Sequence, residues 1–214
     1  MATGSGQTRA VLLDTAERLF SENGIHAVSL RQIRLAAGQG NAAAVQYHFG
    51  DKAGVLQALA DRHVPRLAAV QQALVDDLGS TPSLRDRVDA LVRPFAIYVT
   101  LGPSERAWIR IVDELLADPQ VSVASVEAGS SDVVVGVGTD LHAELSDRLP
   151  ADLAADRIWA ASVFAIRLCA ARARALDDPR STRSLPTDDV FATELVDMAT
   201  GALTAPSHAS QPTA

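Results

Sequence analysis

The segment from Val28 to Lys52 constrains the fold more than any other, because it carries start and stop signals for two short helices in close succession. Ser29 is followed three residues later by Gln32, which is the pattern of a capping box at a helix start. Gly38 is placed to end this first helix, because glycine adopts the left-handed conformation that closes many helices. A short polar turn, Gln39-Gly40, then leads to the second helix.

The second helix of the pair is predicted to be brief and to lie over residues 42–47. Asn41 precedes it and is a good N-cap. Phe49-Gly50 ends it, and Asp51 can cap the longer helix that follows. Two short helices joined by a tight turn that contains glycine, with a longer helix before them at 8–23, follow the helix-turn-helix plan.

Helical spacing of apolar residues recurs through the rest of the chain, without strict alternation and without a repeat of fixed period. Residues 133–138 favour a strand by propensity, but a lone strand has no partner, so we expect a weak helix that is held by packing. Ala, Leu and Arg are abundant and are good helix formers. The predicted fold is all-α, with further helices at about 52–78, 83–101, 105–118, 152–177 and 187–203.

The distribution of charge permits DNA contact near the N-terminus. The net charge of the chain is −7, yet residues 1–54 carry five basic and four acidic side chains. The excess of negative charge therefore lies outside this segment, and the location of charge matters more than its total. DNA binding by the first segment is allowed but not demanded.

Several other classes of protein are excluded by composition. The single cysteine, Cys169, rules out an internal disulfide framework and a cysteine-based zinc cluster, and we predict neither a metal nor a cofactor. No apolar run is long enough to span a membrane. Residues 1–6 lack the charged and apolar regions of a signal peptide, so we expect a cytoplasmic protein with no membrane partner.

The brief helix has a composition that suits entry into a DNA groove. The alanines over 42–44 are small enough to let a helix backbone lie deep in the major groove, and Asn41 and Gln46 can each pair with an adenine edge. Tyr47-His48 could reach phosphates, and Lys52 with the amides that open the next helix offers another anion site. A brief alanine-rich helix is also often mere packing, so the residues alone leave both interpretations open.

Residues 8–56 resemble the DNA-binding domain of the TetR (tetracycline-repressor-like) family of bacterial regulators. The resemblance rests on Ala36-Ala37-Gly38, Tyr47-His48-Phe49 and a lysine four residues after the histidine, with the apolar and capping positions from Ala16 to Ile33. This combination is specific to the family and covers about a quarter of the 214 residues. The stretch between the two tripeptides is one residue longer than the commonest family pattern, which leaves the alignment over 39–41 open.

What the resemblance implies is a ligand-responsive transcriptional regulator, a repressor that a small molecule releases from a palindromic operator in double-stranded DNA. It assigns Arg31 to a base or phosphate contact. The turn and recognition-helix positions that face the groove are Gln39, Asn41, Ala42 and Gln46. The positions that bind the DNA backbone are Tyr47, His48 and Lys52.

The same resemblance implies the division of the chain into domains. We expect a three-helix helix-turn-helix DNA-binding domain, then a larger helical domain for ligand binding and dimerisation. The predicted parts are a flexible N-terminus over 1–7, the DNA-binding domain over 8–54, the regulatory and dimerisation domain over 55–203, and a disordered tail over 204–214.

Homodimerisation is expected through the last two helices. The helix at 152–177 is apolar on too many faces for the surface helix of a monomer, since from Ile158 to Ala171 it is apolar nearly all round. The last helix of a second subunit would cover its outer side across a two-fold axis. The alternative is a helix buried in the centre of a monomer. The last helix is predicted to place four apolar residues on one face, namely Phe191, Leu195, Met198 and Ala202.

An apolar or amphipathic inducer is expected in the larger domain. Most of the aromatic surface of that domain belongs to five candidates for the wall of a cavity, although aromatic residues at helical spacing are more often core. These five are Phe95, Tyr98, Trp108, Trp159 and Phe164. Pro94 frees the carbonyl of Ala90, which could make a polar contact in such a pocket. Arg110 and Arg167 could meet an acidic ligand or pair with acidic side chains.

Neither catalysis nor a histidine site is predicted. The chain has no Ser-His-acid, HExxH or phosphate-loop pattern. The nearest candidate for catalytic carboxylates is Asp113-Glu114, which we interpret as part of a solvent-exposed helix face. His26, His63, His142 and His208 are scattered without the spacing of metal ligands. We therefore expect a regulator and not an enzyme. A helical dimer that binds DNA without a ligand is the further alternative, which the absence of a cavity would favour.

Overall fold

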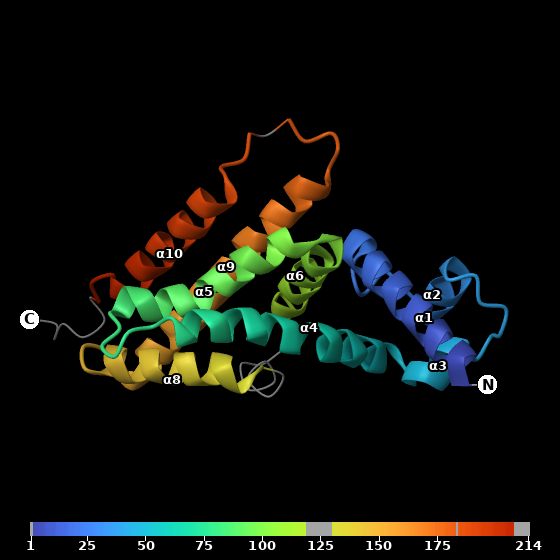
Figure 1. Ribbon diagram of the computed structural model, residues 1–214, viewed down its shortest axis with the longest axis horizontal. Coiled ribbons are helices and arrows are strands. Elements are labelled where there is room, and N and C mark those ends of the chain that lie inside the picture. Colours follow the sequence, from blue (N-terminus) through green and yellow to red (C-terminus); the bar gives the residue numbers. More distant parts are fainter. Residues whose placement is uncertain (1, 119–129, 183, 208–214) are drawn as a thin grey trace, which may run out of the picture.

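The structure of the protein, a computed structural model, describes residues 2–118, 130–182 and 184–207. Within these ranges every element of regular structure is a helix, which confirms the all-α prediction (Figure 1). None of the helices described is both long and apolar enough to cross a membrane. The helices are α1 (Ala2–Asn23), α2 (Leu30–Ala36), α3 (Ala44–Phe49), α4 (Lys52–Asp76), α5 (Leu84–Leu101), α6 (Pro103–Leu116), α8 (Asp132–Ser146), α9 (Ala151–Asp177) and α10 (Asp188–Thr204).

The first three helices form a small unit at one end of the molecule, with the start of α4 beneath them (Figure 1). Its core is built from side chains that are almost wholly buried, and each short helix contributes to it. Because α2 and α3 are too short to be stable alone, these contacts fix their orientation. The core residues are Leu12, Phe20, Val28, Ile33, Val45 and Val55.

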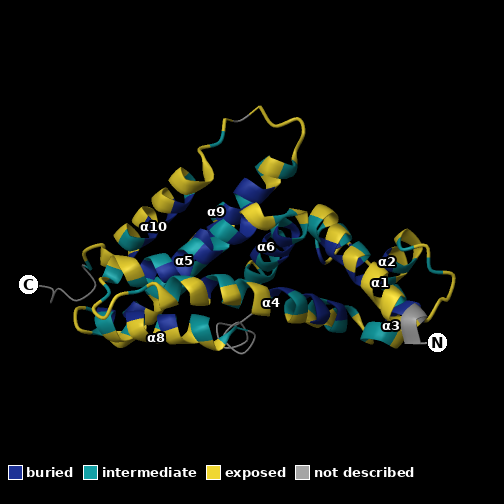
Figure 2. Ribbon diagram, in the orientation of Figure 1, coloured by how far each residue is buried: buried dark blue, intermediate teal, exposed yellow. Residues whose placement is uncertain are grey.

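Helix α4 connects this unit to the larger one and runs along much of the length of the molecule (Figure 1). In the larger unit, α5 packs against α4, α8, α9 and α10, and burial is concentrated along it (Figure 2). Helix α6 lies between α1 and α9 and contacts both. It is therefore placed to connect the two units.

Two helix starts differ from the sequence-based prediction. Helix α1 begins at Ala2, whereas the sequence predicts a helix start near residue 8. No proline interrupts these residues, and extending an existing helix costs far less than nucleating one, even through glycines at about 1 kcal/mol each. Helix α3 begins at Ala44, two residues late, because the Asn41 side chain accepts a hydrogen bond from the Ala43 amide (3.0 Å) in the turn before it.

The buried face of α10 also differs from the predicted one. Met198 is 43% exposed and Ala202 is exposed, although both were expected to share a face with buried Leu195. Helix α10 packs against α5 and α9 together, so its buried stripe is wider and rotated. That stripe comprises Ala192, Leu195, Val196, Ala199 and Leu203. The disordered tail was predicted over 204–214, of which 208–214 lie outside the described residues.

Cys169 in α9 is expected to be inert in the folded protein. Its side chain is fully buried, and burial raises the pKa of the thiol from its ordinary value of 9.0 to about 12. A thiol-reactive disulfide dye at pH 8 should therefore modify Cys169 only as fast as the protein unfolds, and at once in guanidinium chloride. Since the folded pKa is the higher one, this group should lower stability as the pH rises from 9 toward 12. Rapid stoichiometric modification of the native protein would contradict this expectation.

Candidate nucleic-acid interface and ligand cavity

The turn between α2 and α3 is held by local hydrogen bonds. The capping box predicted at the start of α2 is present: the Ser29 hydroxyl accepts from the Gln32 amide (3.2 Å), and the Gln32 side chain accepts from the Ser29 amide (2.8 Å). Gly38 ends the helix with a φ of 68°, a left-handed conformation that favours glycine. The Arg34 guanidinium donates to the carbonyl of Gln39 (2.5 Å) and so closes the turn from inside.

Helix α3 presents one face to the core and the other to solvent. Ala44 and Val45 are buried and anchor the helix, whereas Gln46 is exposed and Tyr47 is 79% exposed. A tyrosine that stays this open on a short helix contributes little to packing. The face therefore has the exposure that a surface for binding another molecule needs.

The other residues predicted for the DNA surface lie around this face. Arg31 on α2 is exposed, as are Asn41 and Ala42 in the turn before α3, while Gln39 is half-buried. The His48 ring is half-buried and packs edge-on against Tyr47, with 5.0 Å between ring centroids. The structure thus brings these positions together on α2, the turn and α3.

Lys52 differs from the others because its ammonium group is already engaged. It donates a hydrogen bond to the carbonyl of Ile25 (2.9 Å), near the start of the loop between α1 and α2. The junction of α3 and α4 is also tight, because a Cβ atom at Gly54 would lie 1.8 Å from the carbonyl oxygen of Phe49. Lys52 therefore braces the small unit from within and does not extend freely from its surface.

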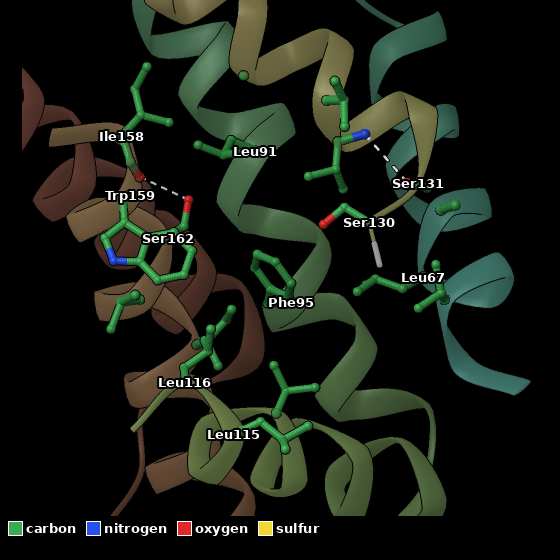
Figure 3. Close-up of a pocket in the computed structure, with 18 of the residues that line it drawn as sticks. Leu67, Leu91, Phe95, Leu115, Leu116, Ser130, Ser131, Ile158, Trp159 and Ser162 are labelled. Atoms are coloured by element: carbon green, nitrogen blue, oxygen red, sulfur yellow. Dashed lines mark hydrogen bonds between the residues drawn. The ribbon is translucent and has the colours of Figure 1, made fainter. Parts of the chain in front are cut away.

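A cavity of about 640 Å³ lies in the larger unit, enclosed by α4, α5, α6, α8 and α9. In Figure 3 the Phe95 ring occupies the centre of the view, with Leu67 on one side and Trp159 on the other, and with Leu115 and Leu116 below. Its volume falls in the range of pockets for small organic molecules. Most of the wall is aliphatic or aromatic.

The described wall of this cavity contains no Asp, Glu, Lys or Arg. Two of its hydroxyl groups already donate to nearby carbonyls, Thr139 to Val135 (2.8 Å) and Ser162 to Ile158 (2.9 Å), and the Ser131 hydroxyl accepts from the Val134 amide (3.4 Å). A hydroxyl that donates in this way retains lone pairs that can accept. The wall therefore offers mostly apolar surface with a few polar groups, among them these hydroxyls and the His142 ring, and no carboxylate, lysine or arginine side chain to pair with an ionised ligand.

Of the five aromatic residues predicted to line a pocket, three do so: Phe95, Trp108 and Trp159. Tyr98 and Phe164 do not border the cavity, contrary to the prediction. The Tyr98 side chain is fully buried on another side of α5, where its hydroxyl lies 2.8 Å from Nδ1 of His63. Phe164 is 36% exposed and lies on the outside of α9.

The polar groups considered as ligand contacts have protein partners instead. The carbonyl of Ala90, freed by Pro94, accepts a hydrogen bond from the buried Gln71 amide group (3.0 Å). Arg110 pairs with Asp177 (3.2 Å). Arg167 pairs with the buried carboxylate of Asp113 (2.9 Å), which rules out the solvated face predicted for that carboxylate. An acidic ligand finds none of these cations in the cavity.

Polar contacts that the sequence does not predict join the two units. Glu17 of α1 is buried and accepts hydrogen bonds from His63 of α4 (2.5 Å) and Ser104 of α6 (2.6 Å). Glu114 of α6 accepts from the Ile25 amide (2.7 Å). One signal was present, because His63 lies on the apolar stripe of its helix, four residues after Leu59 and four before Leu67. A polar side chain in that position needs a buried partner.

Comparison with known protein families gives one match, which covers the candidate interface. Residues 12–59 match the family described as "Bacterial regulatory proteins, tetR family". These residues include α2, α3 and the first part of α4, which form the candidate interface. Comparison with curated protein sequences gives no match.

Solved structures with the same fold include several bacterial regulators. NalD, the secondary repressor of the MexAB-OprM multidrug efflux pump in Pseudomonas aeruginosa, is 24% identical, with 92% of this chain and 95% of NalD covered and a TM-score of 0.56. GusR of Salmonella enterica is 22% identical, with coverage of 92% and 95% and a TM-score of 0.53. A tetR-family regulatory protein from Rhodococcus RHA1 is 18% identical, with coverage of 94% and 98% and a TM-score of 0.55. At these identities the likeness establishes the fold.

Proposed function

Because this chain belongs to the TetR family of bacterial transcriptional regulators, we propose that it is a homodimeric repressor that leaves its operator when a small molecule fills its cavity. Members of this family bind DNA and regulate transcription, and they are not enzymes. The observation that carries the proposal is the outward position of α3, which is anchored by buried Val45 and exposes Gln46 and Tyr47. A braced short helix of this kind can enter a major groove.

In this proposal the residues on and around α3 have different roles in recognising DNA. Gln46, Asn41 and Ala42 face the base edges, where an amide can pair with adenine and a methyl group can meet the methyl of thymine. Gln39 also faces the groove, Arg31 contacts a base or a phosphate, and Tyr47 and His48 contact the DNA backbone. Lys52 acts indirectly: its hydrogen bond to the Ile25 carbonyl holds the loop that leads into α2. We place the boundary between the DNA-binding and regulatory domains at residue 54.

The outer face of α9 and α10 supports the dimer. Four large apolar side chains remain open to solvent on these two helices, and a second subunit packed against them would remove this apolar surface from water. Val190 and Met198 lie eight residues apart on α10, which separates them by about 80° around the helix. The four are Phe164 (36% exposed), Leu176 (43%), Val190 (51%) and Met198 (43%). A two-fold axis would cover this face with its own copy.

Release from DNA then follows from geometry. Two recognition helices in a dimer must be about 34–36 Å apart, or a multiple of this, to enter successive major grooves. A ligand between α4, α5, α6, α8 and α9 bears on both helices that touch the DNA-binding domain, α4 and α6. A modest shift of either helix changes the separation, so binding energy at the cavity can be converted into a loss of DNA affinity.

Selection of bound duplexes from random DNA by the purified full chain tests the proposal. It should return a two-fold symmetric sequence with half-sites about 10 base pairs apart, or a multiple of this. Affinity for the recovered duplex should fall steeply as salt concentration rises, because phosphate contacts release counterions. Enrichment of no sequence, or of one without symmetry, would refute a dimeric repressor.

The cavity is expected to prefer uncharged molecules, and two fluorescent probes that differ only in one sulfonate test this. N-phenyl-1-naphthylamine should bind at least roughly tenfold more tightly than 1-anilinonaphthalene-8-sulfonate, because an ionised group without a partner is costly to bury. Trp159→Ala removes part of the wall and should weaken binding of the neutral probe. Phe164→Ala, an aromatic truncation on the outside of the same helix, is the matched control and should leave it unchanged. Tighter binding of the sulfonate would contradict the uncharged cavity.

A further inference from the structure

His63 lies between the ligand cavity and the DNA-binding domain. Its side chain is fully buried in α4 and is stacked flat on the Trp108 ring of α6, with 5.0 Å between centroids and 6° between planes. Trp108 itself lines the cavity. A ligand that displaces this indole must therefore displace the imidazole behind it, because close-packed rings leave no space to absorb the movement.

Both nitrogens of the His63 ring are held by hydrogen bonds. Nδ1 lies 2.8 Å from the Tyr98 hydroxyl of α5, and Nε2 lies 2.5 Å from Oε1 of Glu17 of α1. Burial raises the pKa of Tyr98 to about 12, so this phenol keeps its proton and can donate to Nδ1. A carboxylate only accepts, so Nε2 donates to Glu17. The ring thus has one fixed position while both bonds last.

Glu17 is the acceptor on the side of the DNA-binding domain. It is 5% exposed, and its second oxygen accepts from the Ser104 hydroxyl of α6 (2.6 Å). The Arg62 guanidinium of α4 approaches the same oxygen at 3.7 Å and is bound more closely by Asp14 (2.8 Å). A buried carboxylate is costly without partners, so α1 is held where His63 and Ser104 can reach it.

We propose that Trp108, His63 and Glu17 form the relay that transmits occupancy of the cavity to the DNA-binding domain. The inference rests on the proposed function and names the residues that position α1 in response to ligand. Movement of Trp108 shifts His63, and the hydrogen bond at Nε2 carries that shift to Glu17, in the C-terminal half of α1. Since α1 braces α2 and α3, the recognition helix moves with it.

A second connection between α6 and the DNA-binding domain provides a matched control. Glu114 accepts from the Ile25 amide (2.7 Å), so it too joins α6 to the loop before α2. Its side chain lies in a separate, smaller cavity of about 240 Å³ with Lys52, and not in the wall of the large one. If α6 moved as one rigid body, the bond at Glu114 would matter as much as the bond at Glu17.

Coupling is reciprocal, so the relay can be tested without an inducer. If occupancy of the cavity changes the position of α1, then DNA that binds to the DNA-binding domain must change the wall of the cavity. The chain has two tryptophans, and Trp159→Phe leaves Trp108 as the only one. The probe is the operator duplex recovered by selection. Anisotropy of the labelled duplex measures DNA binding, and fluorescence emission of Trp108 reports changes in the cavity wall.

In the Trp159→Phe background, DNA should change the emission of Trp108. Glu17→Leu should abolish this change although DNA still binds, and Glu17→Gln should retain about half of it, since a neutral acceptor makes a bond roughly half as strong as a charged one. Glu114→Leu should retain the whole change. If Glu17→Leu does not fold, the comparison of Glu17→Gln with Glu114→Gln carries the test.

Two results would overturn the relay while leaving the proposed function intact. One is a full change of Trp108 emission in the Glu17 variants at saturating DNA. The other is an equal loss in the Glu17 and Glu114 variants, which would assign the coupling to α6 as a whole. Failure of the unaltered chain to bind any selected duplex would instead refute the proposed function, and the relay with it.

Discussion

A dimer with alanine in place of Gln46 in both subunits is expected to bind its operator about 30-fold to 20,000-fold more weakly than the unaltered protein. Gln46 is exposed on α3, so its truncation should leave the fold intact. A well-aligned contact to a base edge is worth about 1–3 kcal/mol, and two-fold symmetry makes each contact twice, so the loss is about 2–6 kcal/mol. Anisotropy of a labelled operator duplex at constant salt measures it.

Two further variants decide whether this loss reflects recognition of bases. Gln72→Ala truncates an exposed glutamine on the part of α4 in the regulatory domain and should leave operator affinity unchanged. Tyr47→Ala should weaken all duplexes to a similar extent, because a backbone contact carries no sequence information. Gln46→Ala should in addition relax the preference at one base pair in each half-site. If Gln46→Ala kept both the affinity and the preference of the unaltered protein, α3 would not be the recognition helix.

Local signals predicted the helix-turn-helix well because the interactions that form it are local. The capping box of α2 joins residues three apart, Ser29 and Gln32, and the stop at Gly38 depends on one residue's backbone conformation. The start of α5 near Ser83 is confirmed for the same reason, since its cap bonds to the amide of Asp86. Asn41 shows the limit of this reasoning, because the same side chain can cap a helix or close a turn, and here it closes the turn.

The cavity was less predictable because composition does not give the direction of a side chain. Phe164 follows Trp159 by five residues, which turns it about 140° around the helix, so one faces the cavity and the other faces outward. Phe95 and Tyr98 are only three residues apart, yet Phe95 lines the cavity and Tyr98 meets His63. The arrangement of five helices decides which side of α5 borders the space, and that arrangement depends on contacts between distant parts of the chain.

The contacts between the two units could not be predicted from local sequence patterns, because they join residues that are far apart in the chain. Glu17 and His63 are 46 residues apart, and Glu114 and Ile25 are 89 apart. Position on an apolar stripe indicated only that His63 needs a buried partner, and the chain has 26 acidic residues that could supply it. Local signals therefore indicated the candidate DNA-binding face, but not the contacts that join its unit to the unit that holds the cavity.

Replacement of Met198 by aspartate is expected to convert the protein into a monomer and to weaken operator binding about 100-fold to 10,000-fold. Met198 lies 43% exposed on the face of α10 that we propose pairs with a second subunit. A charge buried there without a partner is costly, and the two-fold axis introduces it twice. Each monomer then binds only one half-site, so it loses the extra affinity that two linked DNA-binding domains have for two half-sites. Analytical ultracentrifugation measures the mass in solution, and anisotropy measures operator affinity.

Leu101→Asp is the matched control for this experiment. Leu101 is 54% exposed at the end of α5, outside α9 and α10, so the same kind of substitution should leave both the dimer and operator affinity unchanged. The neutral probe should still bind the Met198→Asp monomer, because the cavity is built within one chain. A Met198→Asp protein that remains dimeric would place the subunit interface elsewhere. A monomer that keeps full operator affinity would mean that one DNA-binding domain suffices, and a change in subunit geometry could then not be the cause of release.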